Sequence, residues 1–308
     1  MNNSPLVSVI IPNYNHARYL DQRIQTVLNQ TYQNFEVIIL DDKSTDNSLE
    51  VIAKYKDNPH VSQIVVNEQN SGSTFKQWDK GIHLAKGELI WIAESDDYCE
   101  LNMLEELIKE WTKTDYPVAA HVGYVLFDDN ESFISKSKER KNKTYRGESF
   151  VKKRMARGCV FRNASGAIFK KECAKLLSTE YQSYKSTGDY LFWTQICAMG
   201  KVIEVHKNLT YNRIHMGSVT SNNYTKGITA LEDKRVYDYI MSHWKLNWWQ
   251  KEMALASHYS LYTNTNYDNE DIRSTILSTW GLSNRSQIID KILLWFCGTL
   301  ERHFGILI

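Results

Sequence analysis

Along the first hundred residues, segments with the apolar pattern of a strand alternate with segments whose apolar residues recur at helical spacing. The runs "LVSVIIP", "FEVIILDD", "VSQIVVNEQN" and "ELIWIAESDD" predict strands, and the first two are the continuous apolar stretches typical of strands buried on both faces. Between them, "YLDQRIQTVLNQ", "STDNSLEVIAKYK" and "FKQWDKGIHLAKG" place apolar residues at helical spacing. Strands that alternate with helices predict an α/β fold with a largely parallel sheet.

The pattern becomes less regular after residue 100. It predicts a helix in "NMLEELIKEWTK", a strand and turn in "YPVAAHVGYVLFDDN", and an exposed loop in the basic stretch "ESFISKSKERKNKTYRGES". A strand and a helix follow in "GCVFRNASGAIFKKECAKLL", a helix in "TGDYLFWTQICAMG", and extended structure in "KVIEVHKNLTYNRIH". Beyond residue 222 helical patterns dominate, so we expect one domain over residues 1–222 and a helical region over residues 223–308.

Composition narrows the class of protein. A chain of 308 residues with 42% hydrophobic and 24% charged residues is typical of a globular protein with a sizeable core. Because 37 Lys and Arg nearly balance 36 Asp and Glu, no overall field favours nucleic acid as a partner. A polyanionic ligand would have to be held locally.

The sequence shows neither the pattern of a signal peptide nor that of a membrane-spanning helix. The N-terminal "MNNSPLVSVIIPNYN" has no basic segment before its short apolar run, and no stretch reaches the roughly 18 apolar residues of a membrane-spanning helix. The cysteines are odd in number and form no CxxC pair, which favours a reducing compartment: Cys99, Cys159, Cys173, Cys197 and Cys297. We therefore expect a cytoplasmic protein.

Polar side chains follow each of the four predicted strands. Asn13 and Asn15, the Asp41–Asp42 pair, Asn70 and the acidic group Glu94, Asp96 and Asp97 all stand where a strand ends. The carboxyl ends of parallel strands meet at one edge of the sheet, where ligands bind. Turn formation and helix capping are the alternative explanation, but two adjacent aspartates turn a chain no better than Asn-Gly would.

The acidic group suits a metal ion. Clustered carboxylates repel one another and need a counter-charge. With no Cys or His alongside, carboxylates on a loop favour Mg²⁺ or Mn²⁺, which keep substrate phosphates as further ligands. Neither GxxxxGK[ST] nor GxGxxG follows the first strand, so P-loop hydrolysis and dinucleotide binding lose support.

Taken together, these motifs resemble those of a known family. "VSVIIPNYN", "FEVIILDDKSTDNS", "NSGS", "AKGELIWIAESDD", "GDYLFW" and "NRIHMGSVT" occur in the order and spacing of the family-two glycosyltransferases. The resemblance covers about residues 5–222. It implies the GT-A nucleotide-diphospho-sugar transferase fold, with a mixed, mostly parallel central sheet flanked by helices and a C-terminal helical extension. The nucleotide-binding half would be residues 1–100 and the acceptor-binding half residues 101–222.

The resemblance also implies a nucleotide-sugar site. Its first-strand turn, Pro12, Asn13, Tyr14 and Asn15, would line the nucleotide pocket, and Asp42 would bind the base. The loop Ser95-Asp96-Asp97 would hold the ribose and the metal–diphosphate, with Asp96 and Asp97 rather than the longer Glu94 as metal ligands. Lys76 would face the phosphates, although a solvated helix lysine explains it equally well.

Three later residues complete the site that the resemblance implies. Asp189 in "TGDYLFW" would be the catalytic base, and helix capping is the alternative for an acid at a helix start. His215 in "NRIHMGS" would be a third metal or phosphate contact, although a lone His is more often structural. Arg213 is a second candidate for contacting the diphosphate. Trp78, Trp91 and Trp193 are candidate sugar-stacking surfaces, although Trp91 inside a strand is expected in the core.

The last segment, "SQIIDKILLWFCGTLERHFGILI", is amphipathic. Its aromatic and apolar residues, with Lys291, Arg302 and His303, fit an interfacial helix that contacts the membrane peripherally. A terminal helix packed on the catalytic domain or on a second subunit of a homodimer fits the pattern equally well.

The function expected from the sequence is an inverting, metal-dependent transfer. A hexose would pass from a nucleotide-sugar donor to a glycan or lipid-linked acceptor, as in bacterial surface-polysaccharide biosynthesis. A sugar nucleotidyltransferase is one alternative, but it would want a Gly-rich basic loop where this chain has "PNYNHARYL". A non-catalytic nucleotide-sugar-binding module is another, and the presence of both Asp97 and Asp189 argues against it.

Overall fold

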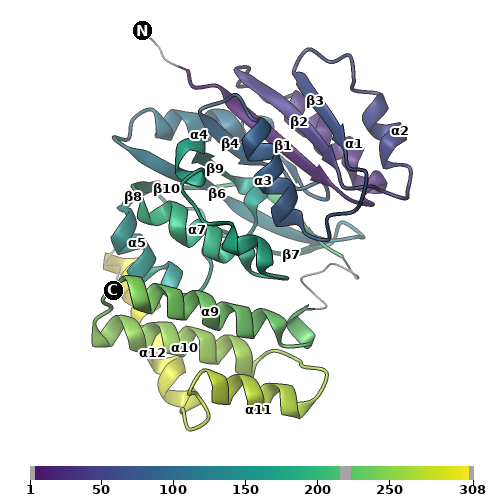
Figure 1. Cartoon of the computed structure of the whole chain (residues 1–308). Coiled ribbons are helices and arrows are strands. Elements are labelled where there is room, and N and C mark those ends of the chain that lie inside the picture. The colour runs from purple at the N-terminus through teal and green to yellow at the C-terminus, as the bar shows by residue number, and fades with distance from the viewer. Residues whose placement is uncertain (1–3, 216–222, 305–308) are drawn as a thin grey trace. The chain divides into compact units, whose positions relative to one another are not determined.

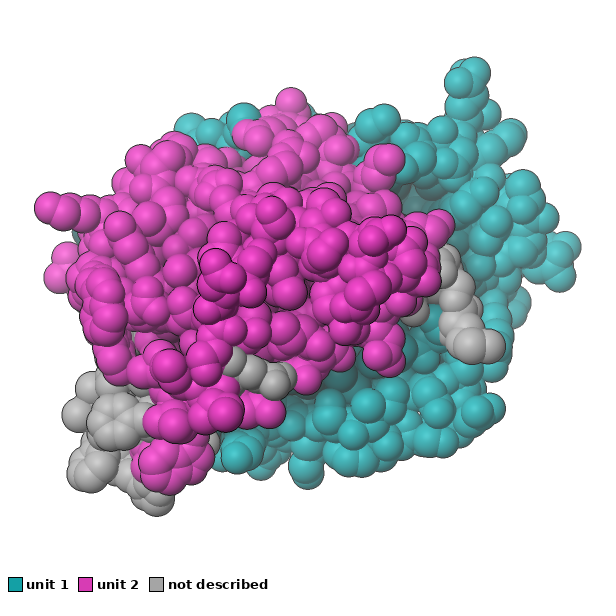
Figure 2. Space-filling view, turned by 90° about the horizontal axis from the view of Figure 1, so that it is seen from below, with its two compact units in different colours: residues 1–145, 161–178, 199–215 teal, residues 146–160, 179–198, 216–308 magenta. Residues whose placement is uncertain are grey.

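The computed structural model describes residues 4–215 and 223–304 (Figure 1). The chain divides into two compact units, which Figure 2 shows in different colours. Unit 1 comprises residues 1–145, 161–178 and 199–215, and unit 2 comprises residues 146–160, 179–198 and 216–308. Each unit is thus built from separated segments of the chain. The domain boundary expected at residue 222 stays a prediction.

The sheet of unit 1 begins with four parallel strands. Their spatial order is β3-β2-β1-β4, and β1 pairs in parallel with both β2 and β4. Helices α1, α2 and α3 alternate with them along the chain, as the periodicity predicts. The elements are β1 (Val7–Asn13), α1 (Ala17–Leu28), β2 (Phe35–Asp41), α2 (Ser48–Ala53), β3 (Val61–Val66), α3 (Thr74–Leu84) and β4 (Leu89–Ile92).

The second half of the sheet is mixed. β9 is antiparallel to both β4 and β6, β10 is parallel to β6, and β5 is antiparallel to β10. The predicted mixed α/β sheet is therefore confirmed. The elements are β5 (Tyr98–Cys99), α4 (Met103–Trp111), β6 (Pro117–Asp128), β9 (Ala167–Lys170), α6 (Lys171–Ala174) and β10 (Lys201–Ile214).

The basic stretch predicted as a loop contains two short strands instead. β7 (Phe133–Lys136) pairs with β6, and β8 (Lys143–Arg146) pairs with β10. Most β7 side chains are exposed. A strand held by backbone hydrogen bonds alone carries no apolar alternation, so the pattern cannot reveal it.

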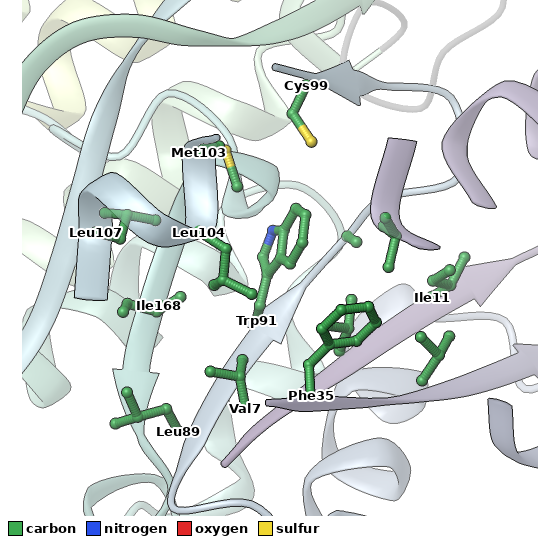
Figure 3. Packing of buried hydrophobic residues seen from close by; sticks show 14 of the residues in the cluster. Val7, Ile11, Phe35, Leu89, Trp91, Cys99, Met103, Leu104, Leu107 and Ile168 are labelled. Atoms are coloured by element: carbon green, nitrogen blue, oxygen red, sulfur yellow. The ribbon is translucent and has the colours of Figure 1, made fainter. Parts of the chain in front are cut away.

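The core of unit 1 lies around β1, β2 and β4, in which every residue is buried. Trp91 of β4 is fully buried and donates its indole N–H to the carbonyl of Ser165 at 2.8 Å. Figure 3 shows it beside Met103 and Leu104 of α4. The prediction that Trp91 belongs to the core is confirmed, and burial satisfies its one polar atom.

Strand directions place several loop residues at one edge of this sheet. β1, β2 and β4 run in one direction, β9 runs against them, and β6 and β10 run against β9. The carboxyl ends of β1, β2, β4 and β10 therefore share an edge. Asn13, Asp41, the loop after Ile92 and the end of β10 at Ile214 all lie there.

Unit 2 is helical. It contains α5 (Gly147–Lys153), α7 (Gly188–Ala198), α9 (Ile228–His243), α10 (Trp248–Thr263), α11 (Glu270–Thr279) and α12 (Gln287–Phe304). The predicted C-terminal helical region is confirmed. α7 is buried on most of its surface, and the hydroxyl of Tyr190 donates to the carbonyl of Met155. Among the described helices, none combines the length and apolar character that a membrane crossing requires.

Candidate donor and metal site

The turn after β1 is held by side-chain hydrogen bonds. Asn13 donates to the carboxylate of Asp41 at 2.8 Å and to the hydroxyl of Ser44 at 3.2 Å. Asn15 has a left-handed backbone (φ 56°), which Asn tolerates better than most residues, and its side chain accepts from the backbone N–H of Thr45 at 2.7 Å. The turn is thereby fixed.

The four predicted nucleotide-pocket residues differ in exposure. Pro12 and Asn13 are buried, whereas Tyr14 and Asn15 are exposed, Tyr14 by 46%. Only the Tyr14 ring offers an open aromatic surface at this turn. The assignment of the turn to the nucleotide pocket stays a prediction.

Asp42 organises the neighbouring loop. Its carboxylate accepts hydrogen bonds from the side chains of Asn67, Ser71 and Gln77 at 2.6, 2.7 and 3.0 Å, and from the backbone N–H of Ser71 at 2.9 Å. It is only 4% exposed. Lys76, by contrast, is exposed and donates to the carbonyl of Ser71 at 3.0 Å. The base-binding role of Asp42 and the phosphate-facing role of Lys76 stay predictions.

Glu94 begins the acidic loop and is turned toward α3. Its carboxyl accepts from the indole N–H of Trp78 at 2.8 Å. Burial, together with the negative charge of Asp96, raises the pKa of Glu94 to about 8. At neutral pH this carboxyl is therefore largely protonated, which reduces the repulsion within the loop.

Asp97 is enclosed by donors of the protein itself. It is 1% exposed and accepts from the side chain of Asn212 and the backbone N–H of Arg213, both at 3.0 Å. Burial and the charge of Asp96 raise its pKa, and the guanidinium of Arg23, 4.0 Å away, opposes that rise. Its predicted role as a metal ligand stays a prediction.

Arg23 of α1 is a fully buried cation beneath the acidic loop. Its Nε donates to the carbonyl of Glu94 at 2.8 Å, and its Nη1 contacts the sulfur of Cys99 at 3.8 Å. The guanidinium also lies 5.9 Å from the Trp91 ring centroid. The acidic residues alone predict a metal ion as the counter-charge, whereas the fold supplies the permanent charge of Arg23 as well.

Asp96 stands apart from its neighbours in the loop. It lies with His16 and His215 in a group whose ligand atoms are all within 4.8 Å of one another. The Nε2 of His215 is 3.3 Å from the Asp96 carboxylate, and the Nδ1 of His16 is 2.8 Å from the hydroxyl of Ser95. Burial alone would raise the pKa of Asp96, but the hydrogen bond from His215 and the charge of His16 lower it. Asp96 therefore stays ionised.

Arg213 supplies a second cation beside this group. Its guanidinium lies between two aromatic rings, 4.5 Å from the Tyr19 centroid and 4.4 Å from that of Phe127. Its Nε donates to the carbonyl of Asp96 at 3.2 Å. The structure thus brings together four of the predicted residues: Asp96, Asp97, Arg213 and His215.

Asp189 belongs to unit 2, at the start of α7. Its carboxylate accepts from the backbone N–H of Tyr190 at 2.8 Å. Burial raises its pKa to about 6, and the charge of Glu232 adds to that rise. Such a value suits a general base near neutral pH. That Asp189 faces the donor site stays a prediction.

His16 and Arg23 were not among the residues predicted from the sequence. Arg23 falls at helical spacing among Leu20, Ile24 and Val27, so a charge on the buried face of α1 was the available signal. His16 directly follows the first-strand turn, which lies next to the tip of β4. The proposal that Trp78 and Trp193 stack on sugars is wrong, because both are buried, with 3% and 0% of their surfaces exposed.

The sequence model described as "Glycosyl transferase family 2" matches residues 8–175. The chain belongs to this family. The resemblance inferred from its motifs is therefore confirmed at the level of the family. The match includes the first-strand turn, the Asp42 loop and the acidic loop, and it ends before Asp189.

Named relatives agree with this assignment. The glycosyltransferase GlyG of Streptococcus pneumoniae is 37% identical over 128 residues, 42% of this chain and 42% of that protein. The hyaluronan synthase of Pasteurella multocida is 29% identical over 222 residues, 72% of this chain and 22% of that protein. The chain thus spans less than half the length of each of these two relatives.

Solved structures show the same fold. Residues 1–349 of S. aureus TarS in complex with UDP-GlcNAc superpose with a TM-score of 0.67 at 18% identity, covering 89% of this chain and 80% of that one. The mannosyltransferase PcManGT of Pyrobaculum calidifontis, in complex with GDP-Man and Mn²⁺, gives 0.60 at 15% identity, covering 98% and 82%. The GT-A fold predicted from the motifs is confirmed.

Replacing the buried cation should destabilise the protein strongly. We expect Arg23→Met to lower the free energy of unfolding by about 3 kcal/mol, because it leaves the carbonyl of Glu94 and the carboxylate of Asp97 buried without their cation. Urea unfolding followed by tryptophan fluorescence measures the change. Arg18→Met, on the exposed face of α1, is the control and should stay within about 0.5 kcal/mol of wild type. Equal stability of the two variants would refute the role given to Arg23.

The group around Asp96 should bind Mn²⁺. We expect Asp96→Asn to abolish the binding measured by the EPR signal of free Mn²⁺, with and without a nucleoside diphosphate. His16→Asn should weaken it at least about tenfold. His83→Asn changes an exposed histidine of α3 and should have no effect. Unchanged affinity in Asp96→Asn would place the metal elsewhere.

Proposed function

We propose that the protein transfers a hexose from a nucleotide-sugar donor to a glycan or lipid-linked acceptor, with inversion at the anomeric carbon. A role in cell-surface polysaccharide biosynthesis is part of the proposal. Two relatives, named hyaluronan synthase and chondroitin synthase, support that role. Fold neighbours in complex with UDP, UDP-GlcNAc and GDP-Man support a nucleotide-sugar donor.

One observation carries the proposal. Asp96, His16 and His215 converge at the carboxyl edge of the sheet, with the guanidinium of Arg213 beside them. An ionised carboxylate and two imidazoles form a donor set that fits a divalent metal ion. Such an ion, when bound, would neutralise the charge that develops on the departing diphosphate. A cationic guanidinium next to it suits the same anionic group.

The donor set narrows the choice of metal. Carboxylates suit both Mg²⁺ and Mn²⁺, whereas imidazoles suit transition metals. With two imidazoles in the group, Mn²⁺ is the better match. Asp97 would support the metal site indirectly, because its oxygens already accept hydrogen bonds from Asn212 and Arg213. Its enclosed carboxylate would fix the end of β10, which carries Arg213 and leads into His215.

The other residues of the proposed donor site lie near the same carboxyl edge of the sheet. Asp42 and Lys76 border one loop, the former buried and the latter exposed. Tyr14 offers its exposed ring for stacking on the base, and the Asp42 loop offers polar groups for the base edge. Lys76 would reach the phosphates from the solvent side.

Asp189 would act as the general base. As the acceptor oxygen forms its bond to the anomeric carbon, the Asp189 carboxylate takes the hydroxyl proton. The bond between the anomeric carbon and the diphosphate oxygen breaks, and the nucleoside diphosphate leaves with that electron pair. A pKa of about 6 leaves the carboxylate ionised at neutral pH and yet basic enough to accept a proton.

Replacing Asp189 should affect turnover but not binding of the donor. We expect Asp189→Asn to lower kcat at least about 10²-fold while the donor still binds. In wild type, kcat should fall as the pH drops below about 6, because protonation removes the base. Release of nucleoside diphosphate from UDP- and GDP-sugars with Mn²⁺, and donor binding by thermal shift, measure both quantities.

A matched control lies in the preceding helix η3 (Thr179–Ser183). Glu180→Gln removes an acid that is half exposed and pairs with Arg235 at 3.7 Å, so its kcat should stay near the wild-type value. Full turnover by Asp189→Asn would assign the base to another residue. Absence of transfer from every common nucleotide-sugar would overturn the proposed function.

We also propose that α12 rests on the membrane surface that holds a lipid-linked acceptor, at its cytoplasmic face. Ile288, Ile289, Ile292 and Trp295 are 72, 59, 60 and 67% exposed and recur at helical spacing. Asp290, the acid in the first turn of α12, is turned inward onto Arg285 at 2.7 Å, and Lys291 is exposed. The described exposed positions from Ile288 to Trp295 are thus apolar with one lysine, which suits an anionic surface. The side chains of Arg302 and His303 lie outside the described residues.

Vesicle binding should depend on this face. We expect Ile288→Ser/Ile292→Ser/Trp295→Ser to lower co-sedimentation with phosphatidylglycerol vesicles at least about tenfold, because each large apolar side chain contributes about 1.5–3 kcal/mol on leaving water. Tyr116→Ser/Phe133→Ser/Leu176→Ser replaces equally exposed side chains of unit 1 and should bind like wild type. A wild-type protein that stays in the supernatant, or one whose α12 face instead mediates dimerisation in light scattering, would overturn the membrane proposal.

A further inference from the structure

Glu232 of α9 binds the chain just ahead of the helix that carries Asp189. Its carboxylate accepts hydrogen bonds from three consecutive backbone N–H groups, those of Lys185, Ser186 and Thr187, at 2.8, 2.9 and 3.0 Å. Glu232 is 8% exposed. A single buried side chain therefore holds the whole segment 185–187, which leads directly into α7.

The position of this carboxylate suits its charge. Residues 185–187 lie directly ahead of α7, where the N-terminal end of the helix dipole favours a negative charge. Consecutive N–H groups that point at one anion stabilise it much as a cation would. Within the described residues no Lys, Arg or His forms an ion pair with Glu232, so these N–H groups are its main counter-charge.

Neighbouring residues hold the same segment. The hydroxyls of Thr229 and Ser186 are hydrogen-bonded at 2.8 Å, and the side chain of Asn223 donates to the carbonyl of Lys185 at 3.1 Å. Asp189 follows this segment after one intervening residue, Gly188. The conformation that delivers Asp189 is thus set by residues 223–232, which are far from it in sequence.

We propose that Glu232 is a positioning residue of the transfer reaction, and that its carboxylate fixes the orientation and the charge environment of Asp189. This inference rests on the proposed function, because it takes Asp189 to be the base. It gives the C-terminal helical region a part in catalysis, beyond that of an appended support. Glu232 itself touches no reacting atom.

The charged groups around α7 single out Glu232. The elements packed against α7 carry several charged or titratable side chains. They are Glu148, Lys152 and Lys153 on α5, Glu180 on η3, and Glu232, Asp233, Lys234, Arg235, Asp238 and His243 on α9. Arg235 pairs with Glu180, and Lys234 pairs with Asp238. After burial, which is the largest cause, Glu232 is the charged side chain that raises the pKa of Asp189. Asp233 is buried and accepts from the hydroxyl of Tyr262 at 2.9 Å. Burial raises its pKa to about 7, and the charges of Asp189 and Glu232 add to that rise, so Asp233 is a second acid that interacts with Asp189. A neutral residue at 232 would therefore make Asp189 less basic.

The test compares Glu232→Gln with Asp238→Asn in the 308-residue chain. Glutamine keeps the size of the side chain but has one acceptor oxygen and no charge, so the hold on residues 185–187 loosens. We expect kcat to fall about 10²-fold with KM for the donor within about twofold, since misplacing a catalytic group affects turnover more than binding. Asp238 lies on the same helix, is 58% exposed and pairs with Lys234, so its replacement should leave both constants unchanged.

The pH dependence of kcat distinguishes a positioning role of Glu232 from a role in stability alone. In Glu232→Gln the acidic fall in kcat should move below pH 6, because the charge that raises the pKa of Asp189 is gone. In Glu232→Asp the charge remains but the side chain is shorter, so kcat should fall while the acidic limb stays in place. This second variant keeps the test decisive if the glutamine variant folds poorly.

A double variant distinguishes failure of this inference from failure of the proposed function. If Glu232 acts through Asp189, adding Glu232→Gln to Asp189→Asn should lower kcat by no more than about twofold further. A full extra loss, or a Glu232→Gln variant that matches Asp238→Asn, would overturn the positioning role. Full activity of Asp189→Asn alone would instead remove the base, and with it the basis of this inference.

Discussion

The arrangement of the donor site depends on one buried cation. Arg23 has no exposed surface, yet it binds the carbonyl of Glu94 and lies 4.0 Å from the carboxylate of Asp97. Three acids within four residues would otherwise repel one another at the end of a buried strand. By joining α1 to the loop after β4, the guanidinium fixes the loop's backbone and offsets its charge. Asp96, which Arg23 does not bind through its side chain, lies instead with His16 and His215.

The loop assigns different tasks to adjacent acids. Glu94 is turned toward Trp78 with a raised pKa, Asp97 is enclosed by Asn212 and Arg213, and Asp96 alone meets two imidazoles with a lowered pKa. Burial would raise the pKa of all three, so the local partners decide which one stays charged. A row of carboxylates that looks uniform in sequence thus contains three acids in different environments, with the pKa of only one of them lowered.

Much of the fold was predictable because its signals are local. Apolar runs identified β1, β2 and β4, and the rule that parallel strands share a carboxyl edge brought Asp96 and Asp97 toward the first-strand turn. The pattern could not show partners chosen by tertiary packing. In the sequence, nothing distinguishes His16 from the other eight of the nine histidines, because its contact with Ser95 forms only when the turn after β1 packs beside the acidic loop. Arg23 resembles any helix arginine unless its apolar neighbours are taken as evidence of a buried face. The strands β7 and β8 lacked a periodic signal altogether.

The discontinuous make-up of unit 2 has a consequence for synthesis. Segment 185–187 leaves the ribosome well before Glu232, yet its backbone N–H groups have Glu232 as their acceptor. Domains fold as units while the chain emerges, so the sheet around β1 and β4 can form early whereas α7 must wait for α9. The nascent chain would then hold an ordered sheet while the segment ahead of α7 still lacks its acceptor, and the order of that segment would arrive only with the last third of the polypeptide.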